Sequence, residues 1–143
     1  MRVTPIADYR QVYLAPAETY PVFDPGRPQD LVQVAPDRRS LIIVTGIAMG
    51  PITLDVDLLD GPDDGPDDDA GADGAERATG TLIIDQPLHL LAPTIDAGVP
   101  QPVFTPPHAG TYAFNITATD RTSHYDQFVQ EPVESYCIRL WAS

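Results

Sequence analysis

The chain contains no lysine: its eight Lys or Arg positions are all arginine, and they face 21 Asp and Glu residues. At a net charge of -13 it has few cations with which to neutralise phosphates, so nucleic acid is disfavoured as a partner. No apolar run approaches the roughly 18 residues that a membrane span requires. We therefore expect a protein that binds neither nucleic acid nor membrane.

Cysteine is almost absent. Cys137 is the single one and has no internal disulfide partner, which is typical of a reducing compartment. Residues 1–5 lack the apolar core of a secretory signal. These two features predict a cytoplasmic location.

Catalytic motifs are missing as well. None of the four serines lies in a Gly-x-Ser-x-Gly context, and Cys137 falls on an expected strand in a chain with little positive charge. The histidines, His89, His108 and His124, lie on separate segments without the close spacing of a metal-ligand pair. We expect no enzymatic activity, no cofactor and no metal site.

What the sequence does contain is a series of short apolar segments separated by 16 prolines and 10 glycines. Residues 52–59 and 111–119 alternate between apolar and polar side chains, as in strands with one wet face. In the last segment Tyr136, Ile138 and Leu140 share one face. Residues 41–48 are apolar on both faces and are expected to form a central strand, joined through residues 49–51 to the next strand as a hairpin.

These segments predict an all-β domain over residues 1–143. The expected architecture is a two-sheet antiparallel sandwich, jelly-roll-like, with seven to eight short strands. A closed barrel is the alternative.

One stretch, residues 60–76, has eight acidic side chains and no aromatic, arginine or β-branched residue. Its composition predicts a long flexible acidic loop. Its aspartates invite a calcium interpretation, but Gly71 and Ala78 fall where an EF-hand needs ligands. If residues 52–59 and 81–85 are adjacent antiparallel strands, a two-residue Asn-Gly turn should replace this loop without loss of the fold.

The rest of the chain is acidic too, with 13 acidic residues against eight arginines, a net charge of -5. An acidic patch on the folded part would steer a basic partner. The residues that we expect to form this partner-binding patch lie on the wet face of residues 52–59 and before the last strand: Asp55, Asp57, Asp126, Glu131 and Glu134. The alternative is a solvated acidic face that only aids solubility.

In the C-terminal third, residues 106–121 (PPHAGTYAFNITATDR) contain a Pro-x-x-Gly-x-Tyr strand start, and residues 131–141 (EPVESYCIRLW) end on Leu-Trp. This ending resembles that of a family of uncharacterised actinobacterial β-sandwich proteins. The layout is distantly similar to competence-protein-J-type inhibitors of a DNA-entry nuclease, which are also small, acidic and β-rich. The resemblance implies an inhibitor or immunity role and assigns no functional residue.

Two functions therefore stay open. The first is a non-enzymatic acidic binding protein, an inhibitor or immunity factor for a basic enzyme such as a nuclease. The alternative is a ligand- or cation-binding structural β-sandwich module, which would need exposed aromatic side chains as a platform. Neither the partner nor the oligomeric state follows from the sequence.

Overall fold

In the computed structural model, residues 1–27, 30–62 and 75–143 are described. They form eleven strands and no helix, so the expected all-β class is confirmed, with more strands than the seven to eight predicted. The strands are β1 (Arg2–Val3), β2 (Ile6–Ala7), β3 (Gln11–Pro16), β4 (Val32–Val34), β5 (Leu41–Val44), β6 (Gly50–Pro51), β7 (Thr53–Leu58), β8 (Ala75–Ile84), β9 (Leu88–Leu91), β10 (Gly110–Thr119) and β11 (Ser135–Ala142). No helix in these ranges is long and apolar enough to cross a bilayer.

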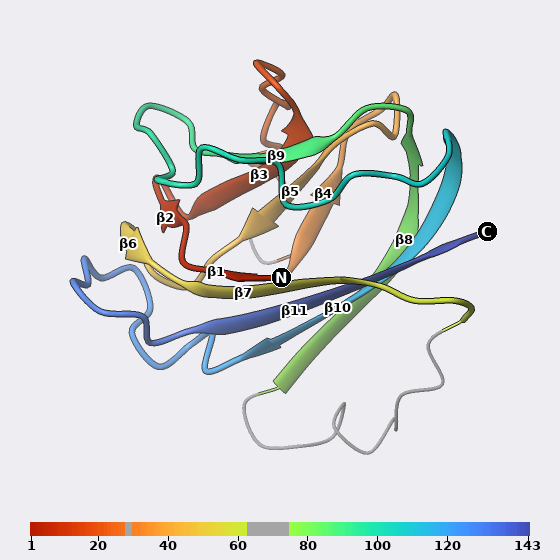
Figure 1. The fold of residues 1–143 in the computed structure, drawn as a ribbon. Coiled ribbons are helices and arrows are strands. Elements are labelled where there is room, and N and C mark those ends of the chain that lie inside the picture. The colour runs from red at the N-terminus through yellow and green to blue at the C-terminus, as the bar shows by residue number, and fades with distance from the viewer. Residues whose placement is uncertain (28–29, 63–74) are drawn as a thin grey trace.

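The strands of the described residues group into three sheets (Figure 1). A five-stranded sheet has the order β1-β7-β11-β10-β8, a four-stranded sheet has the order β4-β5-β3-β9, and β2 pairs with β6. These sheets do not close into a barrel. Pairing is antiparallel except between β7 and β11, which run parallel, so the expectation of a purely antiparallel arrangement was wrong.

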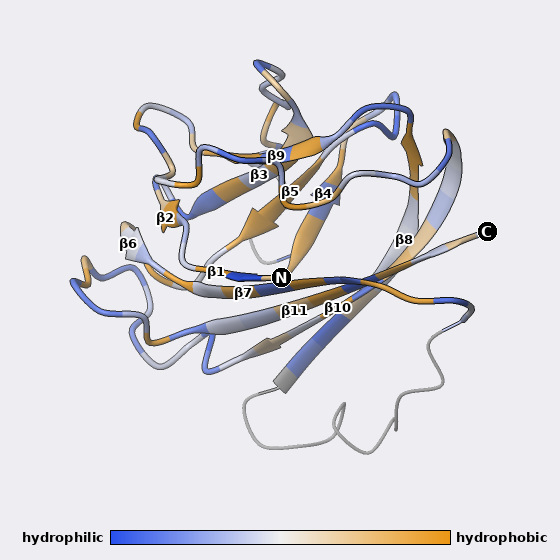
Figure 2. Cartoon of the chain, in the orientation of Figure 1, coloured by the Kyte–Doolittle hydropathy of each residue, from blue (hydrophilic) through white to orange (hydrophobic). Residues whose placement is uncertain are grey.

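The apolar run of residues 41–48 does form a central strand. β5 lies between β4 and β3, and its four residues are all buried. Figure 2 shows β5 and β9 among the most apolar parts of the chain. The predicted hairpin to the next strand is wrong, however, because β5 belongs to the four-stranded sheet and β7 to the five-stranded sheet. The chain passes from one sheet to the other through residues 45–52.

The predicted inward faces are confirmed in β10 and β11. Tyr112, Phe114, Ile116 and Ala118 are all buried, and so are Tyr136, Ile138 and Leu140. They share one hydrophobic cluster with Leu14 and Ile43 of the four-stranded sheet. In β7 the alternation holds for Leu54 and Val56, but Leu58 at the end of the strand is 47% exposed.

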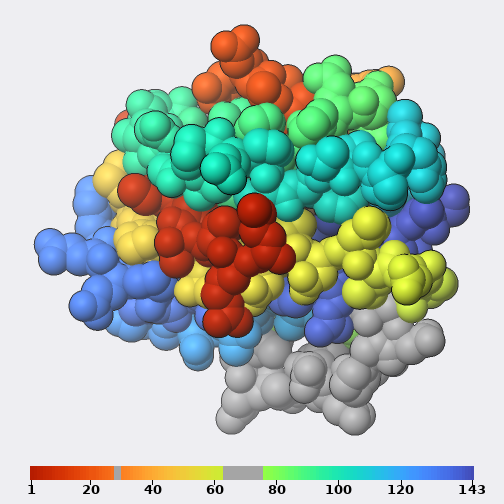
Figure 3. Space-filling model, viewed as in Figure 1, coloured from red at the N-terminus to blue at the C-terminus, as the bar shows by residue number. Residues whose placement is uncertain are grey.

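The N-terminal residues cross between the layers of the molecule. β1 pairs with β7, and the backbone N–H of Ile6 donates to the carbonyl of Ala97 at 2.8 Å. Figure 3 shows this segment, in red, against β7 in yellow and the connection that follows β9 in teal. Residues 1–6 therefore link the five-stranded sheet to the connection that follows β9.

The predicted acidic loop of residues 60–76 overlaps a strand at its end. Ala75 and Glu76 already belong to β8 and pair with Thr119 and Ala118. Asp60 is described and exposed, whereas the remaining acidic positions of that loop, including Asp67 and Asp69, lie in residues 63–74, outside the described part of the chain. β7 and β8 are not neighbours, because β11 and β10 lie between them.

Candidate binding surface

Two residues of the predicted acidic patch, Asp55 and Asp57, lie on the solvent face of β7. Arg2 on β1 faces Asp55 across the strand pair, and its Nε donates to Asp55 Oδ1 at 3.0 Å while Nη2 donates to Oδ2 at 3.1 Å. This two-pronged contact lowers the pKa of Asp55. The amino group of Met1 lies 3.4 Å from Asp57 Oδ1.

Because strand pairing brings cations beside both carboxylates, this edge of the sheet carries compensated charge. The expected part of Asp55 and Asp57 in a partner-binding acidic patch stays a prediction.

A third predicted residue, Glu134, is fully buried. Its Oε1 accepts the backbone N–H of Gly46 at 3.0 Å, its Oε2 accepts that of Ile47 at 2.6 Å, and the Tyr136 hydroxyl donates to Oε1. Glu134 thus holds the chain where it leaves β5. Its placement in a surface patch was wrong, because its carboxylate is used inside the protein by three donors.

Arg121, which the sequence did not single out, is buried beside this network. Its Nε donates to the carbonyl of Val44 at 2.8 Å, and its Nη1 lies 2.6 Å from Glu76 Oε2. Arg121 therefore joins the start of the β10–β11 connection to both β5 and β8. In the sequence, Arg121 stands out only as the one arginine among the acidic residues of this connection.

The remaining predicted residues, Asp126 and Glu131, are exposed on the β10–β11 connection, residues 120–134. Asp120 is exposed on the same connection. Two aromatic side chains accompany these carboxylates: Phe128 is 76% exposed and Tyr125 is 45% exposed. The structure describes this connection over its full length, and its one arginine, Arg121, is buried. Its exposed charged side chains are therefore all carboxylates.

The connection is fastened to the segment between β5 and β6. The backbone N–H of Asp126 donates to Gly46 at 2.7 Å, that of Ala48 donates to Gln127 at 2.8 Å, and that of Val129 donates to Met49 at 2.9 Å. In Figure 1 the connection, in blue, lies beside β6 at the end of the sheet opposite the C-terminus. Its exposed aromatic side chains are therefore mounted on a hydrogen-bonded backbone.

Beside this connection the surface has a cavity of about 360 Å³, which we call the rim cavity. Its wall is largely apolar, and four chain segments meet there: residues 8–10, residues 48–49, Thr94 after β9, and the β10–β11 connection. The lining residues are Asp8, Tyr9, Arg10, Ala48, Met49, Thr94, Asp126 and Phe128. A volume of this size suits a small ligand or one large side chain.

The side chain of Asp8, one of the residues around the rim cavity, is fully buried. Its Oδ2 accepts the backbone N–H of Thr94 at 3.0 Å and also the Thr94 hydroxyl. Its Oδ1 is shielded from water and has no hydrogen-bond partner among the residues that the structure describes. A buried polar atom without a partner costs about 1–3 kcal/mol, so such atoms often mark functional positions.

The guanidinium of Arg10, also in this wall, is engaged from two sides. Its Cζ lies 4.5 Å from the centre of the Tyr125 ring, and its Nη1 donates to the Tyr125 hydroxyl at 2.9 Å. Its Nε donates to the carbonyl of Thr45 at 3.1 Å. Arg10 thereby couples the aromatic part of the β10–β11 connection to the residues that precede β3.

Three residues of the rim cavity have positive φ angles: Tyr9 at 51°, Arg10 at 61° and Asp126 at 58°. Non-glycine residues in this region cost backbone strain, and they cluster at functional sites. In the structure β3 begins at Gln11, and Tyr9 is left 67% exposed at the cavity.

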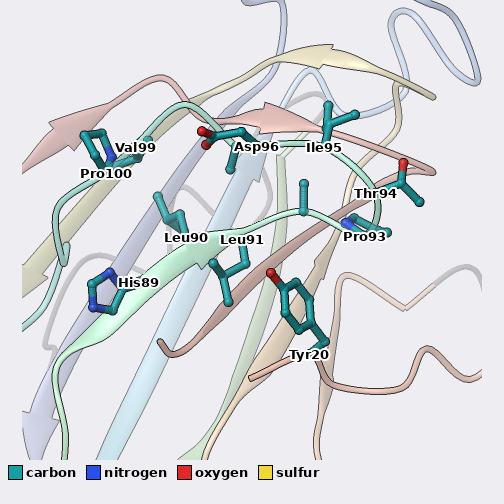
Figure 4. A pocket seen from close by; sticks show the side chains of 12 residues that line it. Tyr20, His89, Leu90, Leu91, Pro93, Thr94, Ile95, Asp96, Val99 and Pro100 are labelled. Atoms are coloured by element: carbon teal, nitrogen blue, oxygen red, sulfur yellow. The ribbon is translucent and has the colours of Figure 1, made fainter. Parts of the chain in front are cut away.

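A second hollow, of about 480 Å³, lies over β9 and the connection that follows it (Figure 4). Among its polar side chains, His89, Thr94 and Asp96 point in different directions in this view. Asp96 accepts the backbone N–H of Gly98 within its own turn. Because these groups do not converge on one point, the hollow is a weaker candidate for a binding site than the rim cavity.

In the described ranges no three His, Cys, Asp or Glu side chains group closely enough to hold a metal ion. Cys137 lies on β11 opposite Asp55, and burial raises the pKa of its thiol. The thiol is therefore less ionised at neutral pH than an ordinary cysteine.

No protein-family model matches the chain, and neither a curated protein nor a solved structure is significantly similar to it. The resemblance of residues 106–141 to a family of uncharacterised β-sandwich proteins, and the more distant similarity of the layout to nuclease inhibitors, thus stay hypotheses.

Proposed function

We propose that the protein is a non-enzymatic acidic binding protein, and that its contact surface is the β10–β11 connection together with the rim cavity. Its partner is a basic protein, so that the chain acts as an inhibitor or immunity factor for a basic enzyme such as a nuclease. The two larger sheets form a jelly-roll-like sandwich that serves as a rigid support for this end. The fold, on this proposal, is one domain in the cytoplasm.

One observation carries the proposal: the β10–β11 connection exposes aromatic side chains, and the exposed charged side chains beside them are all carboxylates. Aromatic side chains are enriched among the residues that dominate binding energy at protein interfaces. Asp120, Asp126 and Glu131 add negative charge without a neighbouring exposed arginine on that connection. Phe128, at 76% exposure, would gain most from being covered.

The charge of the whole chain supports the same partner class. At -13, the chain attracts a basic protein over a distance set by salt, about 10 Å at 0.1 M. The compensated pairs at Asp55 and Asp57 take no part in this contact. Of the five residues first expected to bind a partner, Asp126 and Glu131 are kept in the proposal.

The experiment is a calorimetric titration with the product of the adjacent gene, at low and at high salt. Binding at low salt that weakens with added salt is expected. Phe128→Ala should weaken binding at least about tenfold, since exposed aromatic anchors carry this much. Val22→Ala, at a 90% exposed position away from the connection, is the matched control and should bind like the parent.

Binding of equal strength by Phe128→Ala and Val22→Ala would place the contact elsewhere and refute the proposed surface. No binding to any basic candidate at low salt would refute the partner class.

The alternative, a ligand- or cation-binding module, is favoured by the rim cavity itself. A thermal-shift screen with sugars and Ca²⁺ tests it, because a ligand that binds the native state must raise the melting temperature. A shift that Phe128→Ala abolishes would support this alternative over a protein partner.

A further inference from the structure

We infer that the rim cavity is an anchor pocket for one aromatic side chain, presented by a segment of the protein partner that has basic residues next to it. This inference rests on the proposed function and specifies what enters its site. It starts from three features: a largely apolar wall whose exposed charges balance, a hydrogen-bonded frame, and carboxylates on the connection beside the cavity.

The wall of the rim cavity suits an aromatic ring. Tyr9 and Phe128 are both largely exposed, so the rings of these two lining residues are accessible to a second molecule. Met49, which is half-buried, adds its thioether to the same lining. Aromatic rings pack favourably on other rings and on methionine sulfur, beyond the gain from burying apolar area. An aromatic side chain therefore gains more from this wall than an aliphatic one.

A charged side chain finds no free counter-charge in this lining. Asp8 is fully buried, and its carboxylate is turned to Thr94 and shielded from water. Asp126 and Arg10 carry opposite charges, and Arg10 already donates to the Tyr125 hydroxyl. Because a charge that leaves water without a partner is costly to bury, the lining favours an uncharged occupant.

The cavity is preformed, because hydrogen bonds join the segments that line it. The backbone N–H of Arg10 donates to the carbonyl of Ala48 at 3.0 Å, and that of Ala48 donates to Gln127 of the β10–β11 connection at 2.8 Å. Asp8 accepts the backbone N–H of Thr94 at 3.0 Å. A pocket that is already ordered loses little conformational entropy when it is filled, so one side chain suffices as an anchor.

The charge around the cavity specifies the neighbours of that ring. Asp120 and Glu131 are exposed on the β10–β11 connection, which is described over its full length and exposes no arginine. Arginine or lysine beside the aromatic residue of the partner would complement these carboxylates outside the cavity. A second copy of this chain is a poor occupant, because two copies with a net charge of -13 repel each other.

The test uses short peptides in place of the unidentified partner. Amide signals of the full chain are followed by NMR at low salt while N-acetyl-Arg-Phe-Arg-amide is added, and N-acetyl-Arg-Ala-Arg-amide is the control of equal charge. We expect shifts concentrated on the residues that line the rim cavity. The alanine peptide should bind at least about tenfold more weakly, because it has no ring to bury.

A third peptide tests the basic neighbours. N-acetyl-Ser-Phe-Ser-amide keeps the ring and lacks the charge, so at low salt it should bind more weakly than the arginine-flanked phenylalanine peptide. Added salt should reduce that difference, because it screens charges that are exposed to solvent.

Two variants locate the effect. Tyr9→Asn removes one ring from the wall, and asparagine tolerates the positive φ of this position. It should weaken binding of the arginine-flanked phenylalanine peptide about fivefold and leave binding of the alanine peptide unchanged. If Tyr9→Asn does not fold, the comparison of the peptides on the parent protein still decides the question.

The matched control is Leu58→Asn, which should bind both peptides like the parent. Leu58 is also an exposed side chain, but it lies beside Leu140 near the end of β11, whereas the β10–β11 connection enters β11 at its start.

Equal binding of the phenylalanine and alanine peptides, no binding of either, or shifts scattered over the acidic surface would overturn the inference. Equal binding of the two phenylalanine peptides at low salt would overturn it too, since the basic neighbours would then contribute nothing. Shifts of the lining residues that grow with protein concentration, without any peptide, would show a second copy of the chain in the cavity and would also overturn it.

These outcomes are distinct from failure of the proposed function. A basic protein that binds the parent and Tyr9→Asn equally, but not Phe128→Ala, would keep the surface and remove the anchor. Selective binding of the arginine-flanked phenylalanine peptide at the cavity, without any basic protein partner, would keep the pocket and remove the proposed function.

Discussion

The carboxylate of Glu134 accepts the backbone N–H of Gly46 at 3.0 Å, across 88 positions of the sequence. The same carboxylate accepts Ile47 and Tyr136, so one side chain satisfies three buried donors. The β10–β11 connection is fastened to this segment, because Gly46 also accepts the N–H of Asp126. The buried carboxylate of Glu134 therefore helps to position the connection that we propose as the binding surface.

Glu134→Ala should lower the free energy of unfolding by about 3 kcal/mol, because three buried donors lose their acceptor. Glu134→Gln keeps one acceptor oxygen and should cost less. Urea denaturation measures both. Glu131→Ala, on the exposed side of the same connection, is the control and should stay within about 0.5 kcal/mol of the parent. Equal midpoints for Glu134→Ala and Glu131→Ala would contradict the network.

Gly46→Ala should be more damaging than a glycine substitution elsewhere. A Cβ at Gly46 would lie 1.5 Å from the carbonyl oxygen of Arg121, which is a backbone atom, so the two chain segments would have to move apart. We expect a loss of about 3 kcal/mol or more. Gly61→Ala has nothing within 4 Å of the added Cβ and serves as the control. A urea midpoint for Gly46→Ala near the parent value would show that the two segments separate readily.

Stability should decline in alkali because of Tyr136. Burial raises the pKa of Tyr136, and the Glu134 carboxylate adds to this effect. In the unfolded chain a tyrosine ionises near pH 10, so the unfolded state loses its proton first and stability falls as pH rises above about 10. Below that pH the contribution is fully present.

In Tyr136→Phe the decline should be shallower, although the variant starts from a lower stability because Glu134 loses a donor. Urea midpoints between about pH 9 and pH 11 measure the slope. Tyr13→Phe should act in the same direction, since burial also raises the pKa of Tyr13. A Tyr136→Phe slope equal to that of the parent would refute the assignment.

The connection between β7 and β8 cannot be reduced to a hairpin turn. Both strands run in the same direction, with β11 and β10 between them, and Ala75 lies in the same row of the sheet as Thr53. The chain must return about 17 Å along the sheet and cross about 14 Å sideways, about 22 Å in all.

Replacing residues 60–74 with Asn-Gly should therefore break the fold. The shortened connection spans at most about 14 Å. A ten-residue Gly-Ser segment in the same place should restore a urea midpoint close to the parent, because a flexible chain of that length covers the distance. Cooperative unfolding of the Asn-Gly variant at the parent midpoint would contradict the strand order. The strand order removes the condition on which the sequence-based expectation of a two-residue turn depended, namely that the two strands are antiparallel neighbours.

The sequence by itself determined the strand class and the inward faces. Alternation in β10 and β11 predicted the buried rows because side chains of a strand point to opposite faces in turn, whatever the partner strand is. The doubly apolar run at Leu41–Val44 likewise predicted a strand buried on both sides. These properties are local, so they can be seen in the order of residues.

Partners between strands were decided only by the tertiary structure. Alternation does not distinguish an antiparallel neighbour from a parallel one, so it did not reveal the β7–β11 pair or the separation of β7 from β8. The sequence also does not show which carboxylates have a cation or a hydrogen-bond donor beside them in the folded protein. Arg2 compensates Asp55 through strand pairing, and Gly46 and Ile47 draw Glu134 inside.

The rim cavity has the same origin. Asp8, Met49 and Phe128 are far apart in the chain, and no short-range pattern connects them. The sequence did single out Asp126 and Glu131 in this region, but the exposure of Tyr125 and Phe128 beside them is seen only in the structure. The composition determined an acidic all-β protein, whereas the contacts between distant segments decided where its charge is available and where another molecule has room to bind.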